Sequence, residues 1–147
     1  AVGGGEPLTQ MLLAGKQFLL PVLAGYLMLR FLAGPLSYSI PVAGGLFAPM
    51  LAIGALWGVL FVGVLDIIWP ADVAVLAVPM AVVGMSSFFG ACVRAPLTGI
   101  VVVLEMTAST AAIVPMLAAT ASAVLAANLA GSAPIYDSLR ERSLPKK

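Results

Sequence analysis

The sequence has very little charge. Only 9% of its 147 residues are Asp, Glu, Lys or Arg, where an average soluble domain has about 25%. A soluble fold could not cover its apolar surface with so few charges, so an ordinary soluble enzyme, a nucleic-acid-binding module and a disordered tail are all excluded. Hydrophobic residues make up 62% of the chain, and the mean hydropathy is +1.13. The composition therefore predicts an integral membrane protein that lies in the lipid bilayer.

Histidine is absent, and cysteine occurs once, as Cys92. A disulfide within the chain and a Cys/His zinc site are thereby excluded. No nucleophile–base pair or metal cluster indicates an enzyme, and we expect no metal and no cofactor. Cys92 is interpreted as a small apolar packing residue. The net charge of +1 is too small to indicate nucleic acid or another electrostatic partner.

The few charges are unevenly distributed. From residue 31 to residue 136 the charged residues are Asp66, Asp72, Arg94 and Glu105. From residue 137 onward charges crowd together, with an excess of Lys and Arg. Because Lys and Arg favour the cytoplasmic side of a membrane, we expect residues 137–147 to leave the bilayer on that side.

Gly and Pro interrupt the long apolar runs. The runs 46–65, 73–93 and 111–130 are about long enough to cross hydrocarbon, whereas 96–106 is too short to cross unaided. Residues 17–39 are a further apolar run, interrupted by Pro21, Arg30 and Pro35. Broken helices at membrane depth are tolerated only inside protein or beside a cavity, which favours a transporter or channel over a plain helical bundle. The small-residue pairs Gly54/Gly58 and Ala119/Ala123 predict close helix packing.

The stretch GGLFAP, residues 44–49, predicts a helix start with unusual backbone. Gly44 and Gly45 permit an unwound approach, and Pro49 suits a first helical turn. The backbone amides of Leu46 and Phe47 would then be unpaired donors at the helix N-terminus. Such a terminus binds anions without a full positive charge, which would trap the ion. A simple packing turn is the alternative interpretation.

The stretch RAPLTG, residues 94–99, also predicts a helix start, at Pro96. Arg94 opposes the dipole of that helix, so we expect it to contact a carbonyl, a carboxylate or the membrane interface. Glu105 falls about 16 Å further along the helix axis, too far to pair with Arg94. An intramembrane carboxylate is a functional candidate, but the place of Glu105 near a helix end favours a structural charge, as for Arg94.

The stretch SAPIYD, residues 132–137, predicts a third helix start at Pro134, with Tyr136 in its first turn. A buried tyrosine hydroxyl needs a partner, and a dehydrated anion is one possibility. An ordinary interfacial tyrosine is the alternative.

Together these stretches resemble the CLC family of chloride channels and proton/chloride antiporters. GGLFAP is similar to that family's GGIFAP or GGVFAP element, and RAPLTGIVVVLEMT is similar to a family-typical run. APIYDSL resembles the segment that carries the family's ion-coordinating tyrosine. The order and spacing of the stretches agree, and the resemblance covers nearly the whole chain.

The resemblance implies an all-α membrane protein with broken and tilted transmembrane helices. Residues 1–147 would form a single transmembrane domain, the second of two inverted-repeat halves. The amides of Leu46 and Phe47 and the hydroxyl of Tyr136 would coordinate the central anion. The loop of the site would comprise Gly44, Gly45, Ala48 and Pro49. Helices around 96–106 and 111–130 would lie at a homodimer interface.

The implied function is chloride transport across a membrane, as proton-coupled antiport, with a passive chloride channel as the alternative. The family's gating and proton-transfer glutamates belong to the first half, so neither Glu6 nor Glu105 takes those roles. The isolated chain is therefore expected to be a non-transporting fragment that requires the N-terminal half. We expect a compact form in a prokaryotic inner membrane, with no CBS-type nucleotide-binding domain.

Overall fold

The computed structural model describes residues 6–15, 18–37, 47–69 and 73–143, and every regular element in these ranges is a helix. The seven α-helices and two 3₁₀ turns, η1 and η2, follow one another as α1 (Glu6–Leu13), α2 (Leu20–Ser37), α3 (Phe47–Ile68), η1 (Val73–Leu76), α4 (Ala77–Val93), α5 (Pro96–Thr107), η2 (Thr110–Ala112), α6 (Ile113–Leu129) and α7 (Ile135–Ser143). The predicted all-α class is confirmed.

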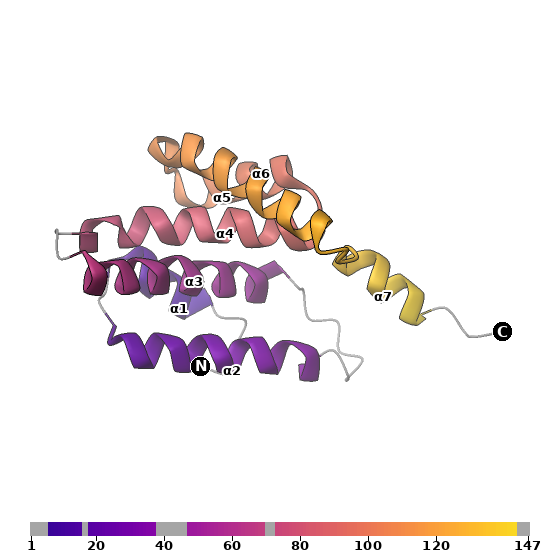
Figure 1. Ribbon diagram of the computed structural model, residues 1–147, viewed down its shortest axis with the longest axis horizontal. Coiled ribbons are helices and arrows are strands. Elements are labelled where there is room, and N and C mark those ends of the chain that lie inside the picture. Colours follow the sequence, from indigo (N-terminus) through magenta and orange to yellow (C-terminus); the bar gives the residue numbers. More distant parts are fainter. Residues whose placement is uncertain (1–5, 16–17, 38–46, 70–72, 144–147) are drawn as a thin grey trace.

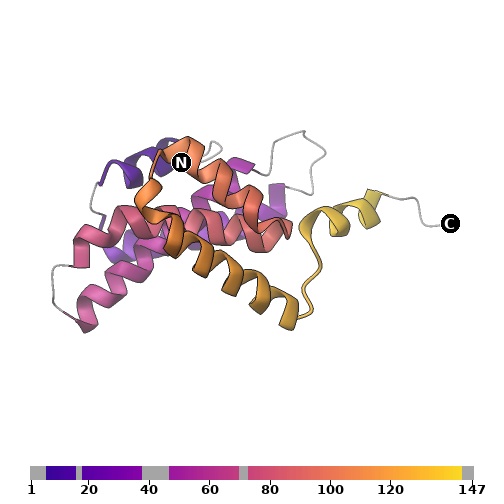
Figure 2. The ribbon, with the colours of Figure 1, turned by 90° about the horizontal axis from the view of Figure 1, so that it is seen from above.

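The helices are arranged around α3 and α4. Figure 1 shows α3 between α2 and α4, with α5 and α6 on the other side of α4. α1 contacts both α3 and α4. Seen from above in Figure 2, α6 crosses the body of the molecule obliquely, and the chain then turns into α7, which extends away.

Three helical stretches are long and apolar enough to cross a membrane. They are Phe47–Ile68, Val73–Val93 and Thr110–Leu129. At 1.5 Å per residue the 22 residues of α3 extend about 33 Å, close to the thickness of the hydrocarbon core. Large apolar side chains are exposed on their outer surfaces, among them Phe61, Val114 and Leu129. An apolar exterior is what lipid requires, so an integral membrane protein is confirmed.

Several boundaries differ from the predicted interruptions. α2 runs unbroken from Leu20 to Ser37 through both of its prolines. Pro21 lies in the first turn, where a missing N–H costs nothing, and Pro35 lies in the last turn. α1 begins at Glu6 and ends at Leu13, shortly before Gly15, which has a φ of +74°.

α3 and α4 pack with their backbones in contact. A Cβ atom added to Gly58 would lie 2.0 Å from the carbonyl oxygen of Met80, and one added to Gly54 would lie 2.5 Å from that of Gly84. The close packing predicted from Gly54 and Gly58 is confirmed. Gly84 lies inside α4, and its missing side chain makes room for α3.

The core lies where α3, α4, α5 and α6 meet. Leu56, Met85, Val103 and Met116, one from each helix, are completely buried or nearly so. Two hydroxyl groups are buried among them: Thr120 donates a hydrogen bond to Ser86 Oγ at 3.3 Å, and Ser86 donates to the Val83 carbonyl at 2.9 Å. Each buried hydroxyl therefore has a partner, as a low-dielectric interior requires.

Candidate functional site

The first candidate element is the N-terminus of α3. The helix begins at Phe47, with Ala48 and Pro49 half-buried in its first turn, so the predicted place of Pro49 is confirmed. The first N–H groups of an α-helix have no partner within the helix, and the helix dipole places partial positive charge there. Leu46, Gly44 and Gly45 lie outside the described residues.

Phe47 is held in place by an aromatic contact. Its ring meets the ring of Phe89 on α4 edge to face, with the centroids 5.3 Å apart and the planes at 76°. Phe89 is buried, and a Cβ atom added to Gly99 in the first turn of α5 would lie 3.1 Å from the Phe89 ring. Phe89 therefore lies between the starts of α3 and α5.

A cavity of about 350 Å³ opens beside the first turn of α3. Phe47, Ala48 and Leu51 line it from α3, and its remaining lining residues are Thr9, Gln10, Leu13 and Met106. The buried Thr9 and the exposed Gln10 give this cavity polar groups from α1. Sequence reasoning did not single out these two residues, because no motif surrounds them and only packing brings α1 to this end of α3.

The second candidate element is the junction of α4 and α5. Pro96 is the first residue of α5, as predicted. Arg94 ends α4 in a left-handed conformation, with φ 61° and ψ 29°, which is uncommon for a residue other than glycine. Of the partners that the sequence left open for Arg94, the structure shows backbone carbonyls: its Nη2 donates to the carbonyl of Ala127, at 2.9 Å, and to that of Ser132.

Glu105 lies at the other end of α5, in the last turn, and it is exposed. Arg94 lies just before α5 and Glu105 lies in its last turn, so the two lie at opposite ends of this helix, as expected. Among the residues that the structure describes, no group of three His, Cys, Asp or Glu could hold a metal ion.

The third candidate element is the start of α7. The helix begins at Ile135, directly after Pro134, and Tyr136 lies in its first turn as predicted. Ile135 is half-buried against the core, and α7 contacts α4, so this end of α7 is attached to the body of the molecule. Tyr136 is 53% exposed, and no described residue hydrogen-bonds its hydroxyl. The hydroxyl can therefore take a ligand.

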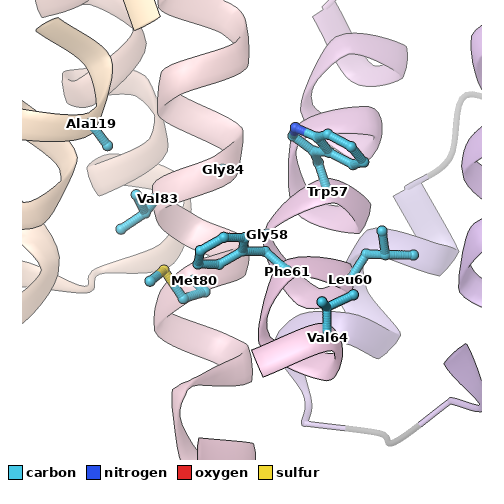
Figure 3. A pocket seen from close by; sticks show the side chains of 9 residues that line it. All are labelled: Trp57, Gly58, Leu60, Phe61, Val64, Met80, Val83, Gly84 and Ala119. Atoms are coloured by element: carbon cyan, nitrogen blue, oxygen red, sulfur yellow. The ribbon is translucent and has the colours of Figure 1, made fainter. Parts of the chain in front are cut away.

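A different cavity, of about 410 Å³, lies against α3 and α4 and is shown in Figure 3. It is lined by Trp57, Gly58, Leu60, Phe61, Val64, Met80, Val83, Gly84 and Ala119. The Trp57 indole is the one polar side-chain group in this lining, so the cavity offers a dehydrated anion almost no hydrogen-bond donors. It suits an apolar occupant, and we do not assign an ion to it.

Comparison with known proteins gives concordant results. The family described as voltage gated chloride channel matches residues 1–128. An H(+)/Cl(-) exchange transporter ClcA of Yersinia pestis is 38% identical over all 147 residues, and one of Klebsiella pneumoniae is 39% identical. The chain spans 30% and 31% of the lengths of these two relatives.

The fold has a counterpart among solved structures. The crystal structure of a slow cyanobacterial Cl⁻/H⁺ antiporter matches 90% of this chain with a TM-score of 0.80 and 34% sequence identity. The match covers 31% of the antiporter chain. The sequence motifs, the apolar helices and all three comparisons agree: this chain belongs to the voltage-gated chloride channel family, whose members transport ions across membranes and are not enzymes.

Proposed function

We propose that this chain is the second inverted-repeat half of a proton-coupled chloride antiporter of a prokaryotic inner membrane. The observation that carries the proposal is similarity over the whole chain to proteins named as H(+)/Cl(-) exchange transporters. The helix starts at Phe47, Pro96 and Ile135 lie where the family-like motifs predict them. The chain forms one transmembrane domain in this proposal, and residues 137–147 lie on the cytoplasmic side.

Chloride binds in this proposal to the backbone amides of Leu46 and Phe47 and to the hydroxyl of Tyr136. The start of α3 at Phe47 and the half-exposed, unpartnered Tyr136 support it among the described residues. The role of the Leu46 amide, and that of the loop that begins at Gly44, are inferred from the GGLFAP motif. Amide dipoles and a hydroxyl hold an anion without a full charge, so the ion can leave again.

The charged residues Arg94 and Glu105 have structural roles in this proposal. Arg94 binds the backbone carbonyls of Ala127 and Ser132 at the C-terminal end of α6. Glu105 is exposed near a helix end, where a carboxylate can reach water or lipid headgroups.

The transporter is proposed to be a homodimer, and each subunit requires an N-terminal half besides this chain. The family resemblance assigns the interface to α5 and α6, whose exposed apolar side chains, such as Leu97, Val101 and Leu125, can pack against a second subunit as well as against lipid. The N-terminal half would supply the glutamates that compete with chloride and carry the proton, so the substrates are chloride and protons and no cofactor is needed.

The test is a flux measurement on the assembled transporter in proteoliposomes. A chloride gradient is imposed, a potassium ionophore clamps the voltage, and the external pH is followed. Uphill proton movement driven by chloride supports the antiporter. Chloride flux without proton movement would replace it by a passive channel, and the absence of both signals from folded dimeric protein would contradict chloride transport.

A further inference from the structure

We propose that Arg94 is a positioning residue for Tyr136: its guanidinium holds the linker between α6 and α7 against the α4–α5 junction, and thereby sets the place of the Tyr136 hydroxyl. The proposal rests on the anion-binding role of Tyr136 given above. Arg94 itself does not touch the anion. Its effect on the site passes through the backbone of the linker.

The linker begins with a regular helix end. The Gly131 amide donates to the Asn128 carbonyl at 3.0 Å, and the Ser132 amide donates to the Ala127 carbonyl at 3.2 Å. Gly131 has a φ of +65°. This pattern is a Schellman motif, which closes α6 and directs the chain away from the helix axis.

Arg94 adds a second set of bonds to this helix end. Nη2 donates to the Ala127 carbonyl, which already accepts from Ser132, and to the Ser132 carbonyl beyond the motif. A cation at a helix C-terminus is favoured by the helix dipole. At the N-terminus of α5 the positive charge of Arg94 would oppose the helix dipole. The side chain instead places this charge at the C-terminus of α6, where it stabilises that helix.

The connection from Ser132 to Tyr136 is short and stiff. Four residues extend about 14 Å at most, and Pro134 fixes one φ angle within them. Ile135 packs against the core, and the Ser138 amide donates to the Pro134 carbonyl at 3.1 Å. With Ser132 held by Arg94, little freedom is left to the backbone of the first turn of α7, from which the Tyr136 side chain extends.

The left-handed conformation of Arg94 contributes to the geometry. It ends α4 and lets α5 begin at Pro96, only two residues later. The residue that forms this turn therefore also binds the linker before α7. The Arg94 side chain thus connects the end of α4 both to the end of α6 and to Ser132 in the linker that precedes Tyr136.

The experiment measures chloride affinity by calorimetry and the apparent melting temperature in the assembled transporter. The variants are Arg94→Met, Tyr136→Ala and their combination. Arg94→Met is expected to weaken chloride binding by about tenfold, as loss of hydrogen bonds from a charged group can. The combined variant is expected to bind chloride no more weakly than Tyr136→Ala. The reason is that Arg94 acts only through the Tyr136 hydroxyl, which Tyr136→Ala already removes.

A lysine variant provides the rescue. Both hydrogen bonds come from one nitrogen of Arg94, and a lysine ammonium also carries several donors on one nitrogen. Arg94→Lys is therefore expected to recover most of the affinity. Arg30→Met, which removes a guanidinium from α2, is the matched control and is expected to leave chloride affinity unchanged.

Two results would overturn the proposal while leaving the anion role of Tyr136 intact: a lower melting temperature of Arg94→Met with unchanged chloride affinity, or additive losses in the combined variant. Unchanged affinity in Tyr136→Ala would instead overturn the proposed anion site itself, and the positioning role with it. If Arg94→Met does not fold, Arg94→Gln, which keeps an amide donor, replaces it in the same comparison.

Discussion

The Phe47 ring meets the Phe89 ring edge to face, with their centroids 5.3 Å apart. This contact joins the first residue of α3 to the buried face of α4. Edge-to-face pairs contribute about 0.5–1.5 kcal/mol beyond the apolar area that they bury. The helix start that is proposed to bind chloride is therefore positioned by a side chain that does not belong to its motif.

Replacing Phe89 by alanine tests this support. Phe89→Ala is expected to lower the free energy of unfolding by about 3–5 kcal/mol, because it removes a buried ring and leaves a cavity. Phe89→Leu fills more of the space and is expected to cost less. The free energy of unfolding in mixed micelles is the measurement. A loss below 1 kcal/mol for Phe89→Ala would contradict the contact as a support of α3.

Removing the Tyr136 side chain tests the proposed anion site. Tyr136→Ala is expected to weaken chloride binding in the assembled transporter and to loosen proton coupling, because a hydroxyl ligand of the anion is lost. Tyr136→Phe, which removes the hydroxyl alone, separates its effect from that of the ring. Bromide occupancy in a crystal and the ratio of chloride to proton flux are the measurements, and the assignment fails if both are unchanged in Tyr136→Ala.

The contact between α3 and α4 depends on Gly58. Gly58→Ala is expected to lower the free energy of unfolding by about 1–3 kcal/mol or more. The new methyl group would meet the Met80 backbone, which cannot move aside as a flexible side chain can. Gly25→Ala on α2 is the matched control, since nothing lies within 4 Å of its added Cβ. This control is expected to be neutral or slightly stabilising. Equal melting temperatures for both variants would argue against the backbone contact.

The buried hydroxyl pair is expected to contribute a modest coupling between α4 and α6. Thr120→Val keeps the shape of the side chain but removes the donor to Ser86 Oγ. A double-mutant cycle with Ser86→Ala is expected to give a coupling energy of about 0.6 kcal/mol, as is typical of hydrogen bonds between helices in membranes. Strictly additive losses in unfolding free energy would show that the two hydroxyls do not interact.

The 147-residue chain alone is expected to conduct no chloride. Half of an inverted repeat would contain only half of an ion site, and the helix ends that face the pore would lack partners. Chloride efflux from liposomes that contain only this chain is the measurement, with the assembled transporter as the positive control. Robust efflux from the chain alone would contradict the requirement for an N-terminal half.

The sequence by itself determined the membrane class, the helical fold and the places where three helices begin. These properties are local. Low charge and long apolar runs select lipid as the solvent, and Pro49, Pro96 and Pro134 each mark a helix start because a proline lacks the N–H that a first turn leaves unused. The family resemblance followed from the same short stretches, and the comparisons confirmed it.

The tertiary structure alone decided which residues support these helix starts. Sequence reasoning left three kinds of partner open for Arg94, and only folding brought it to Ser132, 38 residues away. Thr120 and Ser86 are 34 residues apart, and nothing in the sequence pairs Phe89 with Phe47. The local sequence pattern indicates whether a segment lies in lipid and whether it is helical. The contacts named here depend instead on how helices that are distant in the sequence pack against each other.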